Sequence, residues 1–343
     1  MRANGGNGGG GGGGGGGGRI ALVYQNADGF PFTNVFCLGG FGEARQGSAG
    51  TLYLFEPAAI GGQLFVDAKG ANTSRRPTPL FSLMGGVSTA LDNHTLTDTN
   101  ANFVIGGLIG MKLNPNTNQT RTYTVIGNTT NVIFTDPADG SLLDVGLAGN
   151  AYRASRQLDH LGVQGGAILE VLDADRGRSV RRGQLWTTTA SLTEGSILTH
   201  PPAEADAEFG LELWVTDQLV IDATSRLDVS ARGYLGARSR GNSGSVGYTI
   251  GNSAADGSTR RNGGSYGGLG GLGNAGGTVA AMYGDALDPD CLGSGGGSDS
   301  GAAGAGGGLI RLEVQTLQLD GQLLANGDSG GYWGGGGSGG SIK

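Results

Sequence analysis

The stretch that decides the fold reads FGLELWVTDQLVIDATSRLDVSARG and covers residues 209–233. Apolar and polar residues alternate in it over three short runs, with small polar residues between the runs. Alternation with a period of two is typical of β-strands that bury one face. The residues predicted to point inward are Leu213, Val215, Leu219, Ile221, Leu227 and Val229. The carboxylates of Glu212, Asp222 and Asp228 are expected to point outward.

Similar runs recur along the chain. GSAGTLYLFEPAAIGGQLFVDAKG occupies residues 47–70, GGLIRLEVQTLQLDGQLLANG occupies residues 307–327, and shorter copies begin at residues 16–24 and 165–172. One repeat cannot bury its apolar face alone, so stacked repeats must share a continuous core. Three short strands per repeat, joined by bends and not by hairpin turns, predict an all-β fold. We expect a right-handed parallel β-helix, the hand being that of ordinary parallel connections.

Glycine is the most unusual feature of the composition, with 74 of 343 residues, roughly three times the usual share of about 7%. Collagen is excluded because no Gly-X-Y period accompanies it. The glycine concentrates in residues 5–18, 233–277, 293–308 and 327–340. Two interpretations remain open for these tracts. The glycine runs favour disordered loops that protrude from the coils, but tyrosines in and beside them favour partial order, as extended polyproline-II-like segments packed together.

Residues 88–154 have a different character, because glycine falls and Asn and Thr rise. Strand candidates in this segment are residues 110–114, 121–126, 131–134 and 151–153. Asn-Pro, Gly-Asn and Asp-Gly turns separate them. We therefore expect a small all-β insertion at 88–154. This insertion is expected to divide the β-helix into two parts. The first has coils at 1–87, preceded by the polyglycine tract, and the second has coils with glycine-rich loops at 155–343.

The charge and the cysteine content exclude several classes of protein. The net charge is −7 and the chain has no basic stripe, so nucleic acid is not an expected partner. No run approaches the roughly 20 apolar residues of a membrane helix, and we expect no membrane insertion within this segment. Cys37 and Cys291 lie far apart and form no metal-binding motif. We interpret them as unpaired small residues, with a disulfide as the alternative.

A family resemblance rests on the glycine-rich motifs of the C-terminal half. These motifs are GSYGGLGG (264–271), LGSGGG (292–297), GAGGGLIRL (304–312) and GGGGSGGSI (334–342). In them the chain resembles glycine-rich right-handed parallel β-helix regions of very large bacterial surface or secreted, adhesin-like proteins. LTDTNANF and YTVIGNTTNVIFTD resemble a module carried inside such proteins. The resemblance covers nearly the whole chain. It implies the fold and an extracellular setting, but little about activity, because fold does not determine function.

The two ends lead to an expectation about the whole polypeptide. The first residues, MRAN, run directly into glycine and lack the apolar core of a secretory signal. The last residues, GGGGSGGSIK, stop where a strand would begin. We expect a fragment of a longer extracellular or cell-surface protein whose export signal lies outside this segment.

The sequence contains only weak matches to cofactor-binding, catalytic and metal-binding motifs. GLGGLG (268–273) fits the dinucleotide pattern, but no helix follows it. GGSGG (336–340) fits a nucleophile elbow without a supporting histidine motif. The loop GDALDPD places Asp285, Asp288 and Asp290 close together, and oxygen-rich loops with glycine can bind Ca²⁺. This loop matches no established calcium motif, so solvated turns are the alternative. No other cofactor is expected.

These observations favour a non-catalytic structural or adhesive segment that serves as a stiff spacer or a presenting surface. Its expected partners are a surface polysaccharide or other copies of the same protein. The alternative is a carbohydrate-binding or polysaccharide-cleaving β-helix protein, and no catalytic residue is assigned for it. The side chains expected to stack on sugar rings are Trp214, Tyr234, Tyr332 and Trp333.

Overall fold

The computed structural model describes residues 1–43, 45–56, 59, 61–70 and 76–343. This part of the chain is all-β, as predicted, with nineteen strands in two sheets and three short 3-10 helices. The strands are β1 (Arg19–Val23), β2 (Thr51–Phe55), β3 (Gln63–Asp67), β4 (Thr78–Val87), β5 (Ala90–Leu91), β6 (Thr95–Thr97), β7 (Lys112–Asn114), β8 (Tyr123–Asn128), β9 (Val132–Thr135), β10 (Ala151–Ser155), β11 (Gln157–Gln164), β12 (Ile168–Asp173), β13 (Val180–Leu192), β14 (Ile197–Thr199), β15 (Glu208–Ile221), β16 (Arg226–Asp228), β17 (Leu309–Leu319), β18 (Gln322–Leu324) and β19 (Ser341–Ile342). The helices are η1 (Phe32–Asn34), η2 (Pro137–Asp139) and η3 (Leu142–Asp144). None of the helices described is long and apolar enough to cross a membrane.

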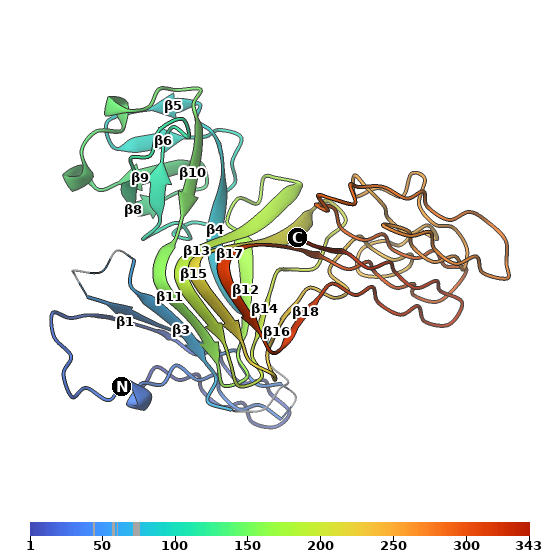
Figure 1. Ribbon diagram of the computed structural model, residues 1–343, viewed down its shortest axis with the longest axis horizontal. Coiled ribbons are helices and arrows are strands. Elements are labelled where there is room, and N and C mark those ends of the chain that lie inside the picture. The colour runs from blue at the N-terminus through green and yellow to red at the C-terminus, as the bar shows by residue number, and fades with distance from the viewer. Residues whose placement is uncertain (44, 57–58, 60, 71–75) are drawn as a thin grey trace.

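The centre of the molecule consists of strands that alternate between the two sheets. In the first sheet β11, β13, β15 and β17 lie side by side, and in the second sheet β12, β14, β16 and β18 do so. Every one of these neighbouring pairs is parallel. From β11 to β18 the chain therefore passes from one sheet to the other and back, and each passage lies against the one before it (Figure 1).

A column of aliphatic side chains fills the space between the two sheets. The parallel register places equivalent residues next to one another, so that Ala190, Leu219 and Leu317 occupy one row. The six side chains predicted to point inward from residues 209–233 are at most 2% exposed, which confirms that prediction. The core thus comes from the alternation of apolar residues within each strand.

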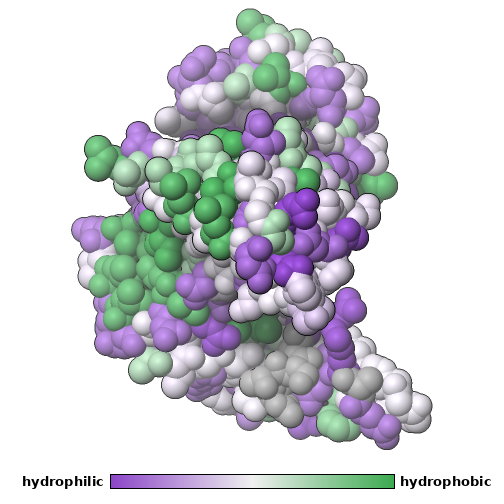
Figure 2. All heavy atoms as spheres, turned by 90° about the vertical axis from the view of Figure 1, so that its right-hand side faces the viewer, coloured by the Kyte–Doolittle hydropathy of each residue, from purple (hydrophilic) through white to green (hydrophobic). Residues whose placement is uncertain are grey.

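Strand β17, the last long strand of the first sheet, leaves part of this column uncovered. Leu317 and Leu319 are about as aliphatic as their register partners Leu219 and Ile221, which are fully buried, but they are 40% and 42% exposed. Figure 2 views the molecule from the side of the C-terminal glycine segments, and hydrophobic residues gather toward the left of that view. The row position alone does not make a side chain buried, since a strand is needed on both sides of it.

A pair of leucine variants tests this account of the core. Leu219→Ala is expected to lower the free energy of unfolding by about 3 kcal/mol, because it removes a fully buried side chain from a packed row. Leu317→Ala, one strand along in the same row, is expected to lower it by less than about 1 kcal/mol. Urea denaturation of both variants is the measurement. Equal losses would contradict the assignment of the column as the stabilising core.

Strands β1 to β3 depart from the predicted parallel arrangement. β1 and β2 are parallel, but β2 pairs antiparallel with β3, so the first sheet is mixed and the expectation of parallel coils is wrong at this pair. The reason is the short connection over residues 56–62. Antiparallel strands can be joined by a few residues, whereas parallel neighbours need a crossover of about a dozen or more.

The segment 88–154 extends the second sheet. β4 pairs in parallel with β12 through its first half and antiparallel with β10 through its second half, and β5 to β10 continue from there with antiparallel pairs. Strands β7 to β10 lie where the sequence predicts strands. The side chains that form a second hydrophobic cluster are Leu83, Leu96, Phe103, Leu108, Met111, Leu113, Tyr123, Val125, Ile133, Leu142, Tyr152, Ala154 and Ala174. Arg156 joins this segment to the coils, since its guanidinium donates to the carbonyls of Phe81, Gly107 and Ile109.

The glycine-rich tracts are ordered, so the interpretation of them as disordered loops is wrong. In the C-terminal half, extended segments at residues 233–237, 245–248, 293–298, 303–307 and 335–338 lie alongside one another (Figure 1). We call these five segments the C-terminal glycine bundle. They belong to neither helices nor strands, and hydrogen bonds between their backbones connect them.

These hydrogen bonds recur every three residues. Tyr234 and Ala237 donate to the carbonyls of Gly293 and Gly296, and Gly304 and Gly307 donate to segment 335–338 with the same spacing. A repeat of three residues is that of the polyproline II helix, which has no internal hydrogen bonds and must find partners outside itself. The second of the two interpretations of the glycine tracts is therefore the correct one.

The N-terminal tract is built in the same way. Gly14 and Gly17 donate to the carbonyls of Arg45 and Ser48, and Gly47 and Gly50 donate to those of Gly40 and Cys37. The spacing is again three residues. This second bundle buries the Cys37 thiol, and both Cys37 and Cys291 are free in the described part of the chain.

Candidate functional site

The most distinctive surface group of the molecule combines aromatic and arginine side chains. The guanidinium carbon of Arg261 lies 3.0 Å from the ring centre of Trp333, and Tyr332 meets Trp333 edge to face at 5.2 Å. Arg261 also donates to Asp299 at 3.0 Å and to Asn274 at 2.9 Å. Arg260 Nη1 lies 4.0 Å from the other carboxylate oxygen of Asp299. We call these six residues the aromatic–arginine cluster.

Turns at the outer end of the C-terminal glycine bundle position this cluster. The chain leaves the coils after β18, turns at residues 330–334 and returns to β19, while the turn at 298–303 precedes the segment that leads into β17. The Asp299 N–H donates to the Trp333 carbonyl at 3.3 Å, which joins the two turns. The hydroxyl of Ser298 donates to the carbonyls of Gly301 and Trp333. The backbone therefore holds side chains from separate turns together.

Three of the four predicted sugar-stacking residues have a ring that is buried or covered on one face, and Trp333, covered by Arg261, is one of them. Tyr234 is only 3% exposed and packs in a small cluster with Leu292 and Leu309, so the expectation that it is exposed is wrong. The glycine segments on both sides of it supply a core that covers its ring. Trp214 lies on the outer face of the first sheet, but Trp186 of the neighbouring strand stacks on it at 4.2 Å. One face of the Trp214 ring is therefore already occupied.

The Trp186–Trp214 pair is itself part of a row along the coils. Arg153 lies over the Trp186 ring at 5.6 Å, and the Trp214 indole donates to Glu313 of the next strand at 3.1 Å. Stacked aromatic pairs of this geometry stabilise the sheet that carries them. These contacts indicate that both tryptophans stabilise the first sheet.

The three aspartates proposed as calcium ligands have separate partners. Asp285 accepts from the Leu287 N–H, Asp288 pairs with Lys343, and Asp290 accepts from the Cys291 thiol. The described residues contain no group of three or more His, Cys, Asp or Glu side chains that could hold a metal ion. The structure therefore does not bring these carboxylates together.

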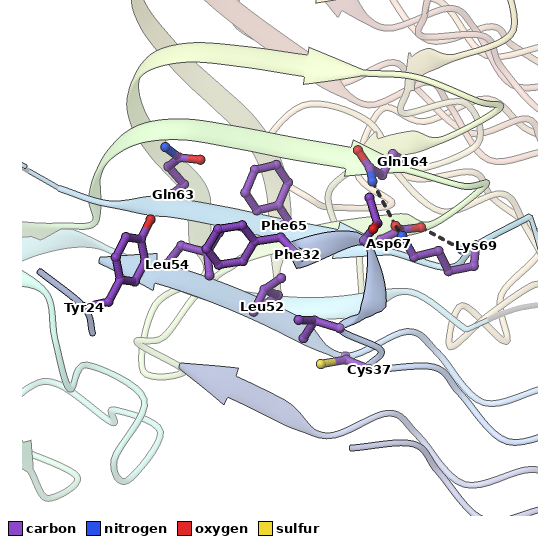
Figure 3. Close-up of a pocket in the computed structure, with 13 residues that line it drawn as sticks. Tyr24, Phe32, Cys37, Leu52, Leu54, Gln63, Phe65, Asp67, Lys69 and Gln164 are labelled. Atoms are coloured by element: carbon purple, nitrogen blue, oxygen red, sulfur yellow. Dashed lines mark hydrogen bonds and ion pairs between the residues drawn. The ribbon is translucent and has the colours of Figure 1, made fainter. Parts of the chain in front are cut away.

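An apolar groove runs beside β2 and β3 in the N-terminal coils. Its cavity volume is about 330 Å³, and Figure 3 shows the rings of Phe32 and Phe65 along it and Asp67, Lys69 and Gln164 at one end. Burial raises the pKa of Asp67, but hydrogen bonds from Lys69 and Gln164 outweigh this and hold that pKa below its usual value. The carboxylate is thus neutralised by its own neighbours, and the groove presents mainly apolar surface.

Two titratable groups, His200 and Asp173, are buried within the fold. The ring of His200 lies between the Pro201 carbonyl, 2.6 Å from Nδ1, and the Leu309 N–H, which donates to Nε2; burial lowers its pKa to about 3. Asp173, at the end of β12, accepts from the Asp175 N–H at 3.0 Å. Its other carboxylate oxygen is buried with no hydrogen-bond partner among the described residues, and burial raises the pKa of Asp173 to about 7.

Sequence reasoning found only part of the aromatic–arginine cluster. Tyr332 and Trp333 are among the predicted sugar-stacking residues, but Arg260, Arg261, Asn274 and Asp299 are not predicted. They lie more than thirty residues from the aromatic pair, and no spacing rule joins them. The available signal was an Arg-Arg pair within a glycine-rich tract of an acidic chain.

No family model, curated protein or solved structure matches the chain. The candidate residues are therefore argued from their geometry alone.

Proposed function

We propose that the chain is a non-catalytic structural and adhesive segment of a large extracellular or cell-surface protein, with a right-handed parallel β-helix as its scaffold. Support for the scaffold comes from the parallel strands β11 to β18, which alternate between two sheets around one aliphatic column. Repeated coils of this kind make an elongated body with broad lateral surfaces. Such a body is suited to hold a binding surface at a distance.

The observation that carries the proposal is the order of the C-terminal glycine bundle. The central segment, residues 293–298, exchanges backbone hydrogen bonds with the segments 234–237, 245–248, 304–307 and 335–338. A flexible glycine linker would not hold a loop in place. This bundle instead fixes the turns that carry Trp333 and Asp299, so it acts as a rigid support for the aromatic–arginine cluster.

Several charged side chains are paired within the fold, which supports a role in holding a binding surface over a role in catalysis. In and beside β16, Arg226 pairs with Asp228 at 3.0 Å and Arg232 pairs with Glu170 at 3.2 Å. Asp222 accepts from the backbone N–H groups of Glu194 and Thr224. These charges neutralise one another or stabilise turns.

Incubation with a panel of acidic and neutral polysaccharides tests the proposal. We expect the chain to bind at least one polysaccharide, seen as retarded migration in affinity electrophoresis. We also expect no new reducing or unsaturated ends after prolonged incubation, measured in the same samples. Release of such ends in proportion to protein concentration would replace this proposal with the polysaccharide-cleaving alternative.

A further inference from the structure

The aromatic–arginine cluster has an exposed guanidinium, that of Arg260, which is only weakly paired. The Arg260 side chain is 57% exposed, and its distance of 4.0 Å from Asp299 is longer than a hydrogen bond. Asp299 is instead engaged at 3.0 Å by Arg261. Two guanidinium groups therefore share one carboxylate, which leaves one positive charge in excess on a chain whose net charge is −7. A guanidinium with free N–H groups binds carboxylates in a planar, bidentate manner.

The backbone at the cluster shows that these side chains are retained at a structural disadvantage. Arg260 and Trp333 have φ values of 55° and 60°. In this left-handed region a side chain costs about 1–2 kcal/mol, whereas glycine is free of strain. Glycine supplies 74 residues of this chain, yet it is not used at these two positions. Seven other non-glycine residues of the described chain also have a positive φ, so the strain shows that these two side chains are costly to keep, and the ligand is argued from their exposure and charge.

Tyr332 adds an open aromatic surface to the aromatic–arginine cluster. The residue is 78% exposed, and its ring meets that of Trp333 edge to face at an interplanar angle of 82°. A pyranose ring can pack its C–H face against such an aromatic ring while its hydroxyl groups stay in water. Aromatic residues with a polar handle suit this kind of half-wet contact.

We propose that the aromatic–arginine cluster binds an acidic polysaccharide through its carboxylate-bearing sugar rings. Tyr332 contacts the face of the ring, and Arg260 pairs with the carboxylate. Arg261 is a positioning residue, because it covers one face of Trp333 and holds Asp299 and Asn274. The proposal rests on the adhesive function above and names the substrate class of its surface.

Calorimetric titration of the intact chain with three probes tests the ligand class. The probes are an oligogalacturonate, the methyl ester of the same oligosaccharide, and poly-glutamate of similar charge. We expect the oligogalacturonate to bind most tightly, with an affinity that falls as salt rises. The ester lacks the charge and poly-glutamate lacks the sugar ring, so each is expected to bind at least about tenfold more weakly, a difference of about 1.4 kcal/mol.

Glycine variants separate binding from folding. Arg260→Gly is expected to leave the melting temperature unchanged or raise it, because it relieves strain, and to weaken oligogalacturonate binding at least about tenfold. Arg238→Gly is the matched control, since Arg238 is also exposed with a φ of 54° but lies outside the cluster. It is expected to have the same effect on melting and none on binding. Tyr332→Ala is expected to weaken binding of the ester and the acid alike.

Three results would overturn this inference: equal affinity for the acid and its ester, equal loss of affinity in the Arg260→Gly and Arg238→Gly variants, or tighter binding of poly-glutamate. Absence of binding to all three probes would also overturn it. The proposed adhesive function fails separately, by release of polysaccharide products or by absence of binding across the whole polysaccharide panel.

Discussion

Replacement of Gly295 by alanine is expected to unfold the C-terminal glycine bundle, with a loss of about 4 kcal/mol or more in the free energy of unfolding of that region. A Cβ atom at this position would lie less than 3.0 Å from the backbone of Leu235 and Gly236. Backbone atoms cannot change rotamer to make room, so the whole neighbouring segment would have to move. That movement would break hydrogen bonds of the segments on both sides.

The matched control for this variant is Gly267→Ala. No described atom lies within 4 Å of a Cβ built at Gly267, so alanine there is expected to be neutral or to stabilise by up to about 1 kcal/mol. Hydrogen exchange of the amides at 293–298 is the measurement, with the coil strand β13 as an internal reference. If Gly295→Ala retained wild-type protection at 293–298, the assignment of close backbone packing would be wrong.

Asp173 is expected to make the stability of the neighbouring β-insertion depend on pH. Its pKa is raised from 3.8 to about 7 in the folded protein, so the native state binds a proton that the unfolded state releases. The free energy of unfolding therefore falls as pH rises from about 4 to about 7 and is level above that. The full effect is up to about 4 kcal/mol, from a shift of roughly 3 units at 1.36 kcal/mol each.

Asp173→Asn removes this dependence and isolates it from other carboxylates. Asparagine is neutral at every pH and keeps an oxygen to accept from the Asp175 N–H. At pH 4 the variant and the wild type should be about equally stable, and at pH 8 the variant should be more stable by as much as the wild type has lost. Hydrogen exchange in β4 and β10 at the two pH values measures this. A variant as stable as the wild type at both pH values would show that the pKa of Asp173 is not raised in the folded protein.

The parts of the fold that depend on side-chain pattern could be predicted from the sequence. The alternation at 209–233 identifies the buried row containing Leu213 and Leu219 because a strand buries every second side chain. The strands predicted at 110–114 and 121–126, between turn residues, lie at 112–114 and 123–128. In these cases the information lies within a few neighbouring residues.

The glycine segments could not be predicted with the same assurance, because their order depends on partners distant in the sequence. Gly304 donates to Gly335, and Gly306 donates to Tyr234, but glycine carries no side chain that would mark either pairing. The burial of Tyr234 follows from these pairings and was missed for the same reason. The antiparallel β2–β3 pair is different. The short connection at 56–62 can be seen in the sequence, and it favours an antiparallel pair.

The aromatic–arginine cluster was only half visible from the sequence for a related reason. Exposed aromatic residues can be recognised one at a time, so Tyr332 and Trp333 were found. Arg261 contacts both Trp333 and Asp299, which lie on two separate turns joined by the Asp299 N–H. A site assembled from separate turns can be predicted only when the positions of the segments between those turns are known.

The central position of residues 293–298 has a consequence for the order of events during synthesis. This segment bonds with 234–237 on its N-terminal side and with 335–338 on its C-terminal side, so its partners span about a hundred residues. A nascent chain that has not yet emerged as far as residue 335 lacks one wall of the bundle. Contacts of such long range slow assembly, so the coils can form while the chain is still being made, whereas the glycine bundle closes last.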